Sequence, residues 1–269
     1  MQNNIKNEKW WDDNTMSYRD WNLNENERKK NNSFSIKTVN KMYLESNPYL
    51  IDFFKKKKIE KKNDKIKFFN VLDIGCGWGS SSIILSDIFD QVYSIDISSI
   101  SVQNAKRNAE FNNKKNITIK KLDAEKIDLK NYFDFVYSWG VIHHSANPTK
   151  IYSKMFDAMK TNSRFMIMVY NKMSLRYWFK GFFELFFKFK IFKGYNFDTV
   201  QKFFTDGYYH KHYIPSILTQ ELENIGFKNL KYELTHMKKS YLPFIKANSK
   251  IDNFFKNKFG WLLVVTGYK

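Results

Sequence analysis

The stretch "VLDIGCGWGSSS", residues 71–82, constrains the fold of this chain more than any other part of it. Its apolar beginning has the composition of a buried strand, and its serine-rich end opens a helical pattern. Between the two, glycine stands at positions 75, 77 and 79. Glycine lets the backbone turn tightly and lets a ligand approach the main chain closely. The stretch therefore predicts a strand, a ligand-binding turn and a helix.

The glycine spacing and one nearby charge narrow the class of ligand. A dinucleotide-binding turn has the pattern G-x-G-x-x-G, and a P-loop ends in Gly-Lys-Ser/Thr, whereas this turn reads G-x-G-x-G. Asp73 stands two residues before the first glycine. A carboxylate at this place disfavours a pyrophosphate, which is itself anionic. The turn therefore predicts a ligand that carries positive charge.

Short apolar runs alternate with amphipathic stretches from residue 68 to residue 170. This alternation predicts a parallel sheet with helices on both faces, and ligands bind such sheets beyond the carboxyl ends of the strands. Helices are expected over 80–89, 99–112 and 149–160, and again over 217–227. The strands are expected at 68–74, 91–97, 117–123, 132–140, 163–170, 228–237 and 261–269.

Three further motifs follow the next strands in order. Asp96 ends the second strand, 21 residues after Gly75, where a carboxylate can accept both hydroxyl protons of a ribose. "LDAE" ends the third strand and "YSWG" ends the fourth. Taken together, the four motifs resemble those of the class I S-adenosylmethionine-dependent methyltransferases. The resemblance covers residues 68–170.

The resemblance implies a Rossmann-like, doubly wound α/β fold with a mostly parallel seven-stranded sheet. It also implies S-adenosylmethionine as the methyl donor and S-adenosylhomocysteine as the product. The donor is a sulfonium with an ammonium group, which agrees with the charge argument for Asp73. The implied cofactor-binding residues are Asp73, Gly75, Gly77, Gly79, Asp96, Ile97, Asp123, Ala124, Ser138 and Trp139.

Two adjacent histidines, His143 and His144, follow the fourth strand. Methyl transfer needs an acceptor held near the methyl group and, where the acceptor is protonated, a base. Imidazole titrates near neutral pH, so we expect one of the pair to act as the catalytic base or to orient the substrate. The alternative is that one histidine only braces the cofactor loop, because related methyltransferases with different acceptors carry a similar pair.

The acceptor pocket is expected from segments outside the core. We divide the chain into an N-terminal helical lid (1–65), the cofactor-binding core (66–170), an aromatic helical insertion (171–215) and a C-terminal part that completes the sheet (216–269). Arg176 is the natural clamp for a carboxylate or phosphate. The candidate substrate-binding residues are Tyr18, Tyr170, Arg176, His210 and Tyr213.

The composition leaves several partners open. The formal net charge of +18 attracts nucleic acid, anionic lipid and small anions alike. We favour a small-molecule acceptor, because the chain shows no RNA-binding motif and lacks the "[DN]-P-P-[YF]" pattern. Residues 178–192 repeat aromatic side chains among lysines, which predicts an interfacial helix, a substrate cap or a homodimer contact.

The compartment is also predicted from composition. The single cysteine, Cys76, fits a reducing environment, and the polar start "MQNNIKNEKWWDD" has no signal-peptide pattern. No metal site is expected, because the adjacent histidines would point opposite ways on an extended segment. We therefore expect a cytoplasmic enzyme without a metal.

Overall fold

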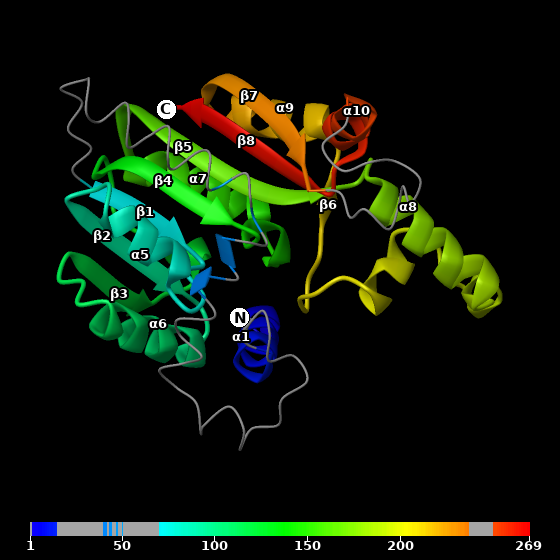
Figure 1. Cartoon of the computed structure of the whole chain (residues 1–269), viewed down its shortest axis with the longest axis horizontal. Coiled ribbons are helices and arrows are strands. Elements are labelled where there is room, and N and C mark those ends of the chain that lie inside the picture. The colour runs from blue at the N-terminus through cyan, green and yellow to red at the C-terminus, as the bar shows by residue number, and fades with distance from the viewer. Residues whose placement is uncertain are drawn as a thin grey trace.

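The computed structural model describes residues 2–14, 40–41, 43–44, 47, 50, 70–236 and 250–269. A single mixed sheet lies at the centre of the fold. The strand order is β3-β2-β1-β4-β5-β8-β7, and the short β6 pairs with β5 (Figure 1). The strands are β1 (Asn70–Ile74), β2 (Gln91–Asp96), β3 (Ile117–Lys121), β4 (Phe133–Trp139), β5 (Met159–Asn171), β6 (His212–Tyr213), β7 (Lys228–Thr235) and β8 (Leu262–Tyr268).

The pairing confirms the predicted doubly wound sheet. β1 pairs in parallel with β2 and with β4, and β8 lies antiparallel between β5 and β7. From β1 the chain proceeds to β2 and β3 on one side, and it then crosses to β4 and β5 on the other. The strand order thus reverses between β1 and β4, and open α/β sheets bind ligands at such a switch point.

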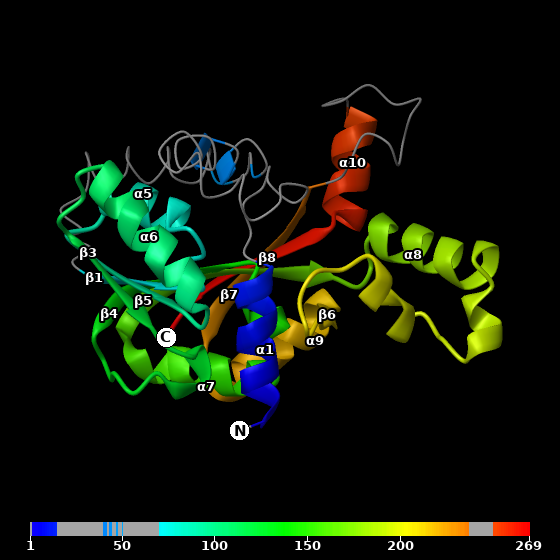
Figure 2. The ribbon, with the colours of Figure 1, turned by 90° about the horizontal axis from the view of Figure 1, so that it is seen from below.

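Helices cover both faces of the sheet (Figure 2). α5 (Ser80–Ser86) and α6 (Ser99–Phe111) lie on one face, and α7 (Pro148–Ala158) and α9 (Pro215–Ile225) lie on the other. Because successive strand residues point to opposite faces, Val71 joins the core cluster on the α5 side and Leu72 joins the other cluster. Both side chains are buried, as expected for a central strand.

Two elements stand outside these layers. The first is α1 (Gln2–Asp13), which supplies a helix to the predicted lid, while most of residues 15–65 lie outside the described part of the chain. The second comprises α8 (Leu175–Phe182), the π-helical turn η4 (Phe183–Phe187) and the 3-10 turns η5 (Lys190–Lys193) and η6 (Thr199–Phe203). We call residues 175–203 the aromatic arm; it projects from the body in both views (Figures 1 and 2). A further helix, α10 (Lys250–Phe259), precedes β8.

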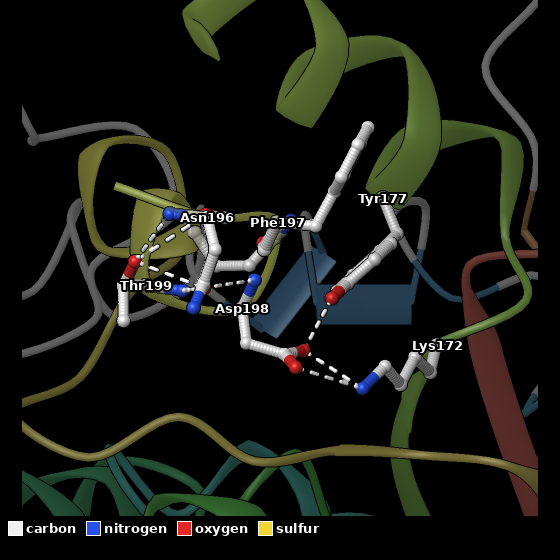
Figure 3. A network of polar contacts seen from close by, with 7 residues as sticks. Lys172, Tyr177, Asn196, Phe197, Asp198 and Thr199 are labelled. Carbon is white, nitrogen blue, oxygen red and sulfur yellow. Dashed lines mark hydrogen bonds and ion pairs between the residues drawn. The ribbon is translucent and has the colours of Figure 1, made fainter. Parts of the chain in front are cut away.

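One carboxylate secures the base of the aromatic arm (Figure 3). Asp198 accepts a hydrogen bond from the hydroxyl of Tyr177 and pairs with the ammonium of Lys172 at 2.8 Å. The side chain of Asn196 accepts from the backbone N–H groups of Asp198 and Thr199, which fixes the turn that presents the carboxylate. The returning half of the arm is therefore fastened to its outgoing half.

In the part of the chain that the structure describes, no helix has the length and apolar character to cross a bilayer.

Replacing Phe133 by alanine is expected to destabilise the fold by about 3–5 kcal/mol, because it removes a fully buried ring and leaves a cavity. Phe133 packs edge-on against Tyr93 and Tyr132 at the start of β4. The control is Phe254→Ala, at a side chain that is 58% exposed on α10. Urea unfolding followed by circular dichroism measures both; equal losses for the two variants would contradict the assigned core.

Candidate active site

One cavity of about 480 Å³ lies at the carboxyl ends of β1, β2 and β4, within the size range of small-molecule sites. The predicted residues that line it are Asp73, Gly75, Gly77, Asp96, Ile97, Asp123, Ala124, Trp139, His144, Tyr170 and Arg176. Five others lie outside its lining: Gly79, Ser138, His143, His210 and Tyr213. Tyr18 lies outside the described residues.

The glycine turn has the left-handed backbone that the sequence pattern requires. Gly75, Gly77 and Gly79 have φ angles of 73°, 53° and 79°. A Cβ on Gly75 would lie 2.2 Å from a methyl carbon of Val141, so only glycine lets the loop after β4 approach the turn. A Cβ on Gly79 would lie 3.1 Å from the Cβ of Ala105 on α6. Gly79 therefore shapes the turn by helix packing, outside the cavity.

Asp73 is almost fully buried at the end of β1, yet it lines the cavity. Its Oδ2 accepts hydrogen bonds from the hydroxyls of Ser81 and Ser82, each at 2.7 Å. Burial raises the pKa of the Asp73 carboxyl to about 6, and the two serine hydroxyls oppose this rise. A cationic ligand in the cavity would favour the ionised carboxylate.

Asp96 holds the glycine turn from the neighbouring strand. Its Oδ2 accepts from the backbone N–H of Gly77 at 2.9 Å, and its Oδ1 accepts from that of Ser98 at 2.8 Å. Burial raises the pKa of Asp96 to about 6 as well, against these two hydrogen bonds. Two buried carboxylates with raised pKa values around one cavity are typical of a functional site.

The end of β3 is tied to the loop after β4. Asp123 Oδ1 accepts from the backbone N–H of Glu125 and caps the 3-10 turn η2 (Ala124–Lys126). The buried carboxylate of Glu125 in turn accepts from the hydroxyl of Ser145 at 2.7 Å and from the backbone N–H of Asn147 at 3.2 Å. The capping role of Asp123 is compatible with contact to a ligand, since Asp123 also lines the cavity.

The adjacent histidines have different environments. His144 lines the cavity, and its Nδ1 lies 2.7 Å from the backbone oxygen of Tyr209. Because a carbonyl oxygen only accepts, Nδ1 carries the proton and Nε2 has a lone pair in the neutral ring. Burial lowers the pKa of His144 to about 4, so the ring is neutral at pH 7.

His143, by contrast, is fully buried behind the cavity wall. Its ring lies 4.0 Å from the ring centroids of both His144 and Tyr170, and neither of its nitrogens has a hydrogen-bond partner among the described residues. Burial lowers its pKa well below the ordinary histidine value. This position suits the bracing role more than contact with a substrate.

Aromatic rings line the far end of the cavity. Tyr170, at the end of β5, stacks on Trp261 at a centroid distance of 4.3 Å. The guanidinium of Arg176 lies 4.7 Å from the centroid of the Trp261 ring and donates to the backbone oxygen of Phe204 at 2.8 Å. Asp206 lines the same end, and burial raises its pKa. This end therefore offers flat apolar surfaces with one cation and one carboxyl group.

Helix α1 closes one side of the cavity. The amide of Asn7 donates to the backbone oxygen of His144 at 3.1 Å, and the ring of Trp11 lies 5.2 Å from the His144 ring. Asp12 accepts from the hydroxyl of Ser98 at 2.7 Å, just after β2. α1 thus contacts the loops on both sides of the switch point.

Sequence reasoning missed several residues of this cavity. Trp261 comes from the start of β8, and Asn47 accepts from the indole N–H of Trp139 at 2.9 Å across 92 positions of sequence. Tyr43 bonds hydroxyl to hydroxyl with Tyr137 at 2.8 Å. Trp261, Asn47 and Tyr43 belong to no motif. The only signal was the density of aromatic side chains near both ends of the chain.

We expect the affinity for S-adenosylhomocysteine to fall as the pH drops below about 6, because Asp73 and Asp96 then take up protons.

The stability of the unliganded protein should rise over the pH range in which the affinity falls. Between the unfolded pKa of 3.8 and the folded value of about 6, the folded state binds more protons, so stability rises as the pH falls. Calorimetric titration and thermal unfolding at several pH values measure the two trends.

Asp96→Asn is expected to weaken S-adenosylhomocysteine binding at pH 7.5 by on the order of 10- to 100-fold, the usual cost of a lost charged hydrogen bond. Asp90→Asn, at an exposed carboxylate before β2, is the matched control. Unchanged affinity in Asp96→Asn would remove Asp96 from the cofactor site.

Comparison with known proteins agrees with this geometry. Residues 67–186 match the family model of a methyltransferase domain. The fold is similar to that of an Archaeoglobus fulgidus S-adenosylmethionine-dependent methyltransferase, with a TM-score of 0.53 and 19% identity over 79% of this chain and 92% of that one. It is also similar to phosphoethanolamine N-methyltransferase 2 of Haemonchus contortus, solved with phosphomonomethylethanolamine and S-adenosylhomocysteine, with a TM-score of 0.53 and 17% identity over 78% of this chain and 51% of that one.

A third similar structure is a Haloferax volcanii putative methyltransferase in complex with the Trm112 activator, with a TM-score of 0.52 and 14% identity over 75% of this chain and 83% of that one. Among curated proteins, a tRNA/tmRNA (uracil-C(5))-methyltransferase of Idiomarina loihiensis is 39% identical over 57 residues, which are 21% of this chain and 16% of that enzyme. At these identities the solved structures show the fold, while the family match identifies the domain. Residues 67–186 are therefore a methyltransferase domain, and the fold is similar to that of solved S-adenosylmethionine-dependent methyltransferases.

Proposed function

We propose that the enzyme transfers the methyl group of S-adenosylmethionine to an oxygen, nitrogen or sulfur atom of a small-molecule acceptor by in-line displacement. The observation that carries the proposal is that the glycine turn and the aromatic end line one and the same cavity. A cofactor at the turn and a flat acceptor against the rings would lie side by side, which is the arrangement that displacement requires.

The residues present fit the cofactor. Asp73 is a buried carboxylate without a described cationic neighbour, and it suits the positive charge of the amino acid part. A Cβ built on Gly77 meets nothing within 4 Å, so the turn leaves open space for a ligand. Asp96 would accept from the ribose hydroxyls, and Asp123 would meet the adenine. When bound, the cofactor supplies an already activated methyl group.

The acceptor would lie between Tyr170, Trp261 and Trp11, with Arg176 and Asp206 as polar contacts. His144 presents a neutral ring with a fixed tautomer on the cavity wall. With a pKa of about 4 it is a weak base at neutral pH. We therefore propose that Nε2 of His144 accepts a hydrogen bond from an O–H or N–H of the methyl acceptor and so orients it. In this proposal His144 does not take up the proton.

The size and closure of the cavity favour a small acceptor over RNA. A volume of about 480 Å³ must hold the cofactor as well as the acceptor. α1 further narrows the space through Asn7 and Trp11. An RNA acceptor would need an open groove that follows the backbone, with stacking rings along it.

Incubation of the enzyme with methyl-labelled S-adenosylmethionine and a metabolite extract tests the proposal. We expect label in a low-molecular-mass product, and loss of this product with Asp96→Asn. Label that appears only in RNA, in protein or nowhere would contradict a small-molecule acceptor.

His144→Gln is expected to lower kcat by on the order of 100-fold, with S-adenosylhomocysteine affinity unchanged within about twofold, because only acceptor orientation is lost. His143→Gln is the matched control. It removes the ring contacts with His144 and Tyr170 in a fully buried site, so it should lower the melting temperature and leave kcat within a few-fold of the unmodified enzyme, roughly the effect of lost packing alone. A normal kcat for His144→Gln would refute the orienting role.

A further inference from the structure

The aromatic arm turns its phenylalanines away from the protein. Over α8 and η4, the side chains of Tyr177, Gly181, Glu184 and Leu185 are buried. The opposite side carries five phenylalanines that are 42–66% exposed: Phe179, Phe182, Phe183, Phe186 and Phe187. A surface helix of a globular protein ordinarily directs its apolar stripe at the core. This helix therefore has a second apolar side that the described structure leaves uncovered.

The contacts of the buried side show that this orientation is fixed. Asp198 binds Tyr177 and Lys172 at the arm base (Figure 3). A Cβ on Gly181 would lie 2.8 Å from the Phe197 ring, so the two halves of the arm are in close contact there. Rotating the helix to bury the phenylalanines would break these contacts.

The exposed apolar surface continues beyond the helix. Phe189, Ile191 and Phe192 are 64%, 42% and 83% exposed. Neighbouring rings contact each other, with centroid distances of 4.6 Å for Phe182 and Phe186 and 5.5 Å for Phe183 and Phe187. Soluble monomers rarely expose a contiguous apolar patch of this extent unless it binds something.

The charge of the arm points to the kind of partner. Residues 175–203 contain six lysine or arginine side chains and two carboxylates. Both carboxylates already pair with lysines: Glu184 with Lys188 and Lys190, and Asp198 with Lys172. Lys180, Lys193 and Lys202 are exposed on the same arm. The arm therefore combines an apolar surface with a net positive charge.

We propose that the aromatic arm binds an anionic lipid bilayer, with its phenylalanines at the level of the headgroups and its lysines on the lipid phosphates. Exposed aromatic and basic side chains on one projecting segment are the combination that an interfacial anchor uses. A second copy of the chain is the less favoured occupant, because it would bring two arms of like charge together. The proposal does not depend on which acceptor is methylated.

The arm also has a defined relation to the cavity. Arg176 stands at its beginning and Asp206 follows its end, and both line the aromatic end of the cavity. A bilayer bound to the arm would therefore lie near the end of the cavity that Arg176 and Asp206 line.

Vesicle flotation in the absence of S-adenosylmethionine tests the proposal without reference to catalysis. We expect the full chain to float with mixed phosphatidylcholine and phosphatidylglycerol vesicles and to stay at the bottom with phosphatidylcholine alone. Phe183→Ser/Phe187→Ser should weaken partitioning at least about tenfold, because two rings no longer insert. Lys180→Gln/Lys193→Gln/Lys202→Gln should weaken it by about 100-fold, since each lysine near the surface contributes roughly fivefold.

Matched variants separate the arm from general charge and hydrophobicity. Phe111→Ser/Phe254→Ser removes two phenylalanines that are 49% and 58% exposed elsewhere, and Lys115→Gln/Lys130→Gln/Lys150→Gln makes the same change in net charge. Both controls should float like the unmodified chain. No flotation, or equal losses in arm and control variants, would overturn the proposal. So would a dimer in sedimentation that only the arm variants disrupt and that does not float.

Discussion

The hydrogen bond from the backbone of Gly77 to the carboxylate of Asp96 is the interaction on which the site depends. It joins the turn after β1 to the end of β2. The backbone N–H groups of Gly75 and Cys76 add to this junction, because both donate to the oxygen of Ile95. With the turn held in this way, the loop after β4 can approach Gly75 closely, and three strand ends meet at one cavity. The same carboxylate faces that cavity, so one group both builds the turn and is available to a ligand.

The two histidines illustrate how burial decides a role that residue type leaves open. A histidine on the surface titrates near neutral pH, and the pair after β4 therefore looked equally suited to proton transfer. In the structure, desolvation lowers both pKa values. One neighbouring carbonyl then fixes the tautomer of His144, while the ring of His143 packs against the rings of His144 and Tyr170. Adjacent positions in the sequence thus differ in access, in hydrogen bonding and in possible function.

Much of the fold could be predicted from the sequence, because period and turn chemistry are local. The boundaries of β2, α6 and β8 lie within about a residue or two of those expected. β5 begins four residues earlier than expected, at Met159, because pairing with Phe133 extends it. The cofactor motifs could also be identified from the sequence, since each stands at a strand end. The residues on the acceptor side could not be identified in this way, because Trp261, Asn47 and Asn7 come from the two ends of the chain and meet only after folding.

The contact between α1 and the loop after β4 has a consequence for how the enzyme assembles. Asn7 and His144 are 137 positions apart in the chain, and α1 contacts the rest of the described structure through side-chain hydrogen bonds, an ion pair and the ring of Trp11. Contacts of such long range form late, after the loop between them has been closed. We therefore expect α1 to dock after the sheet has formed. Because α1 lies outside the sheet and lines the cavity, a local opening of this helix would expose the cavity while the sheet stays folded.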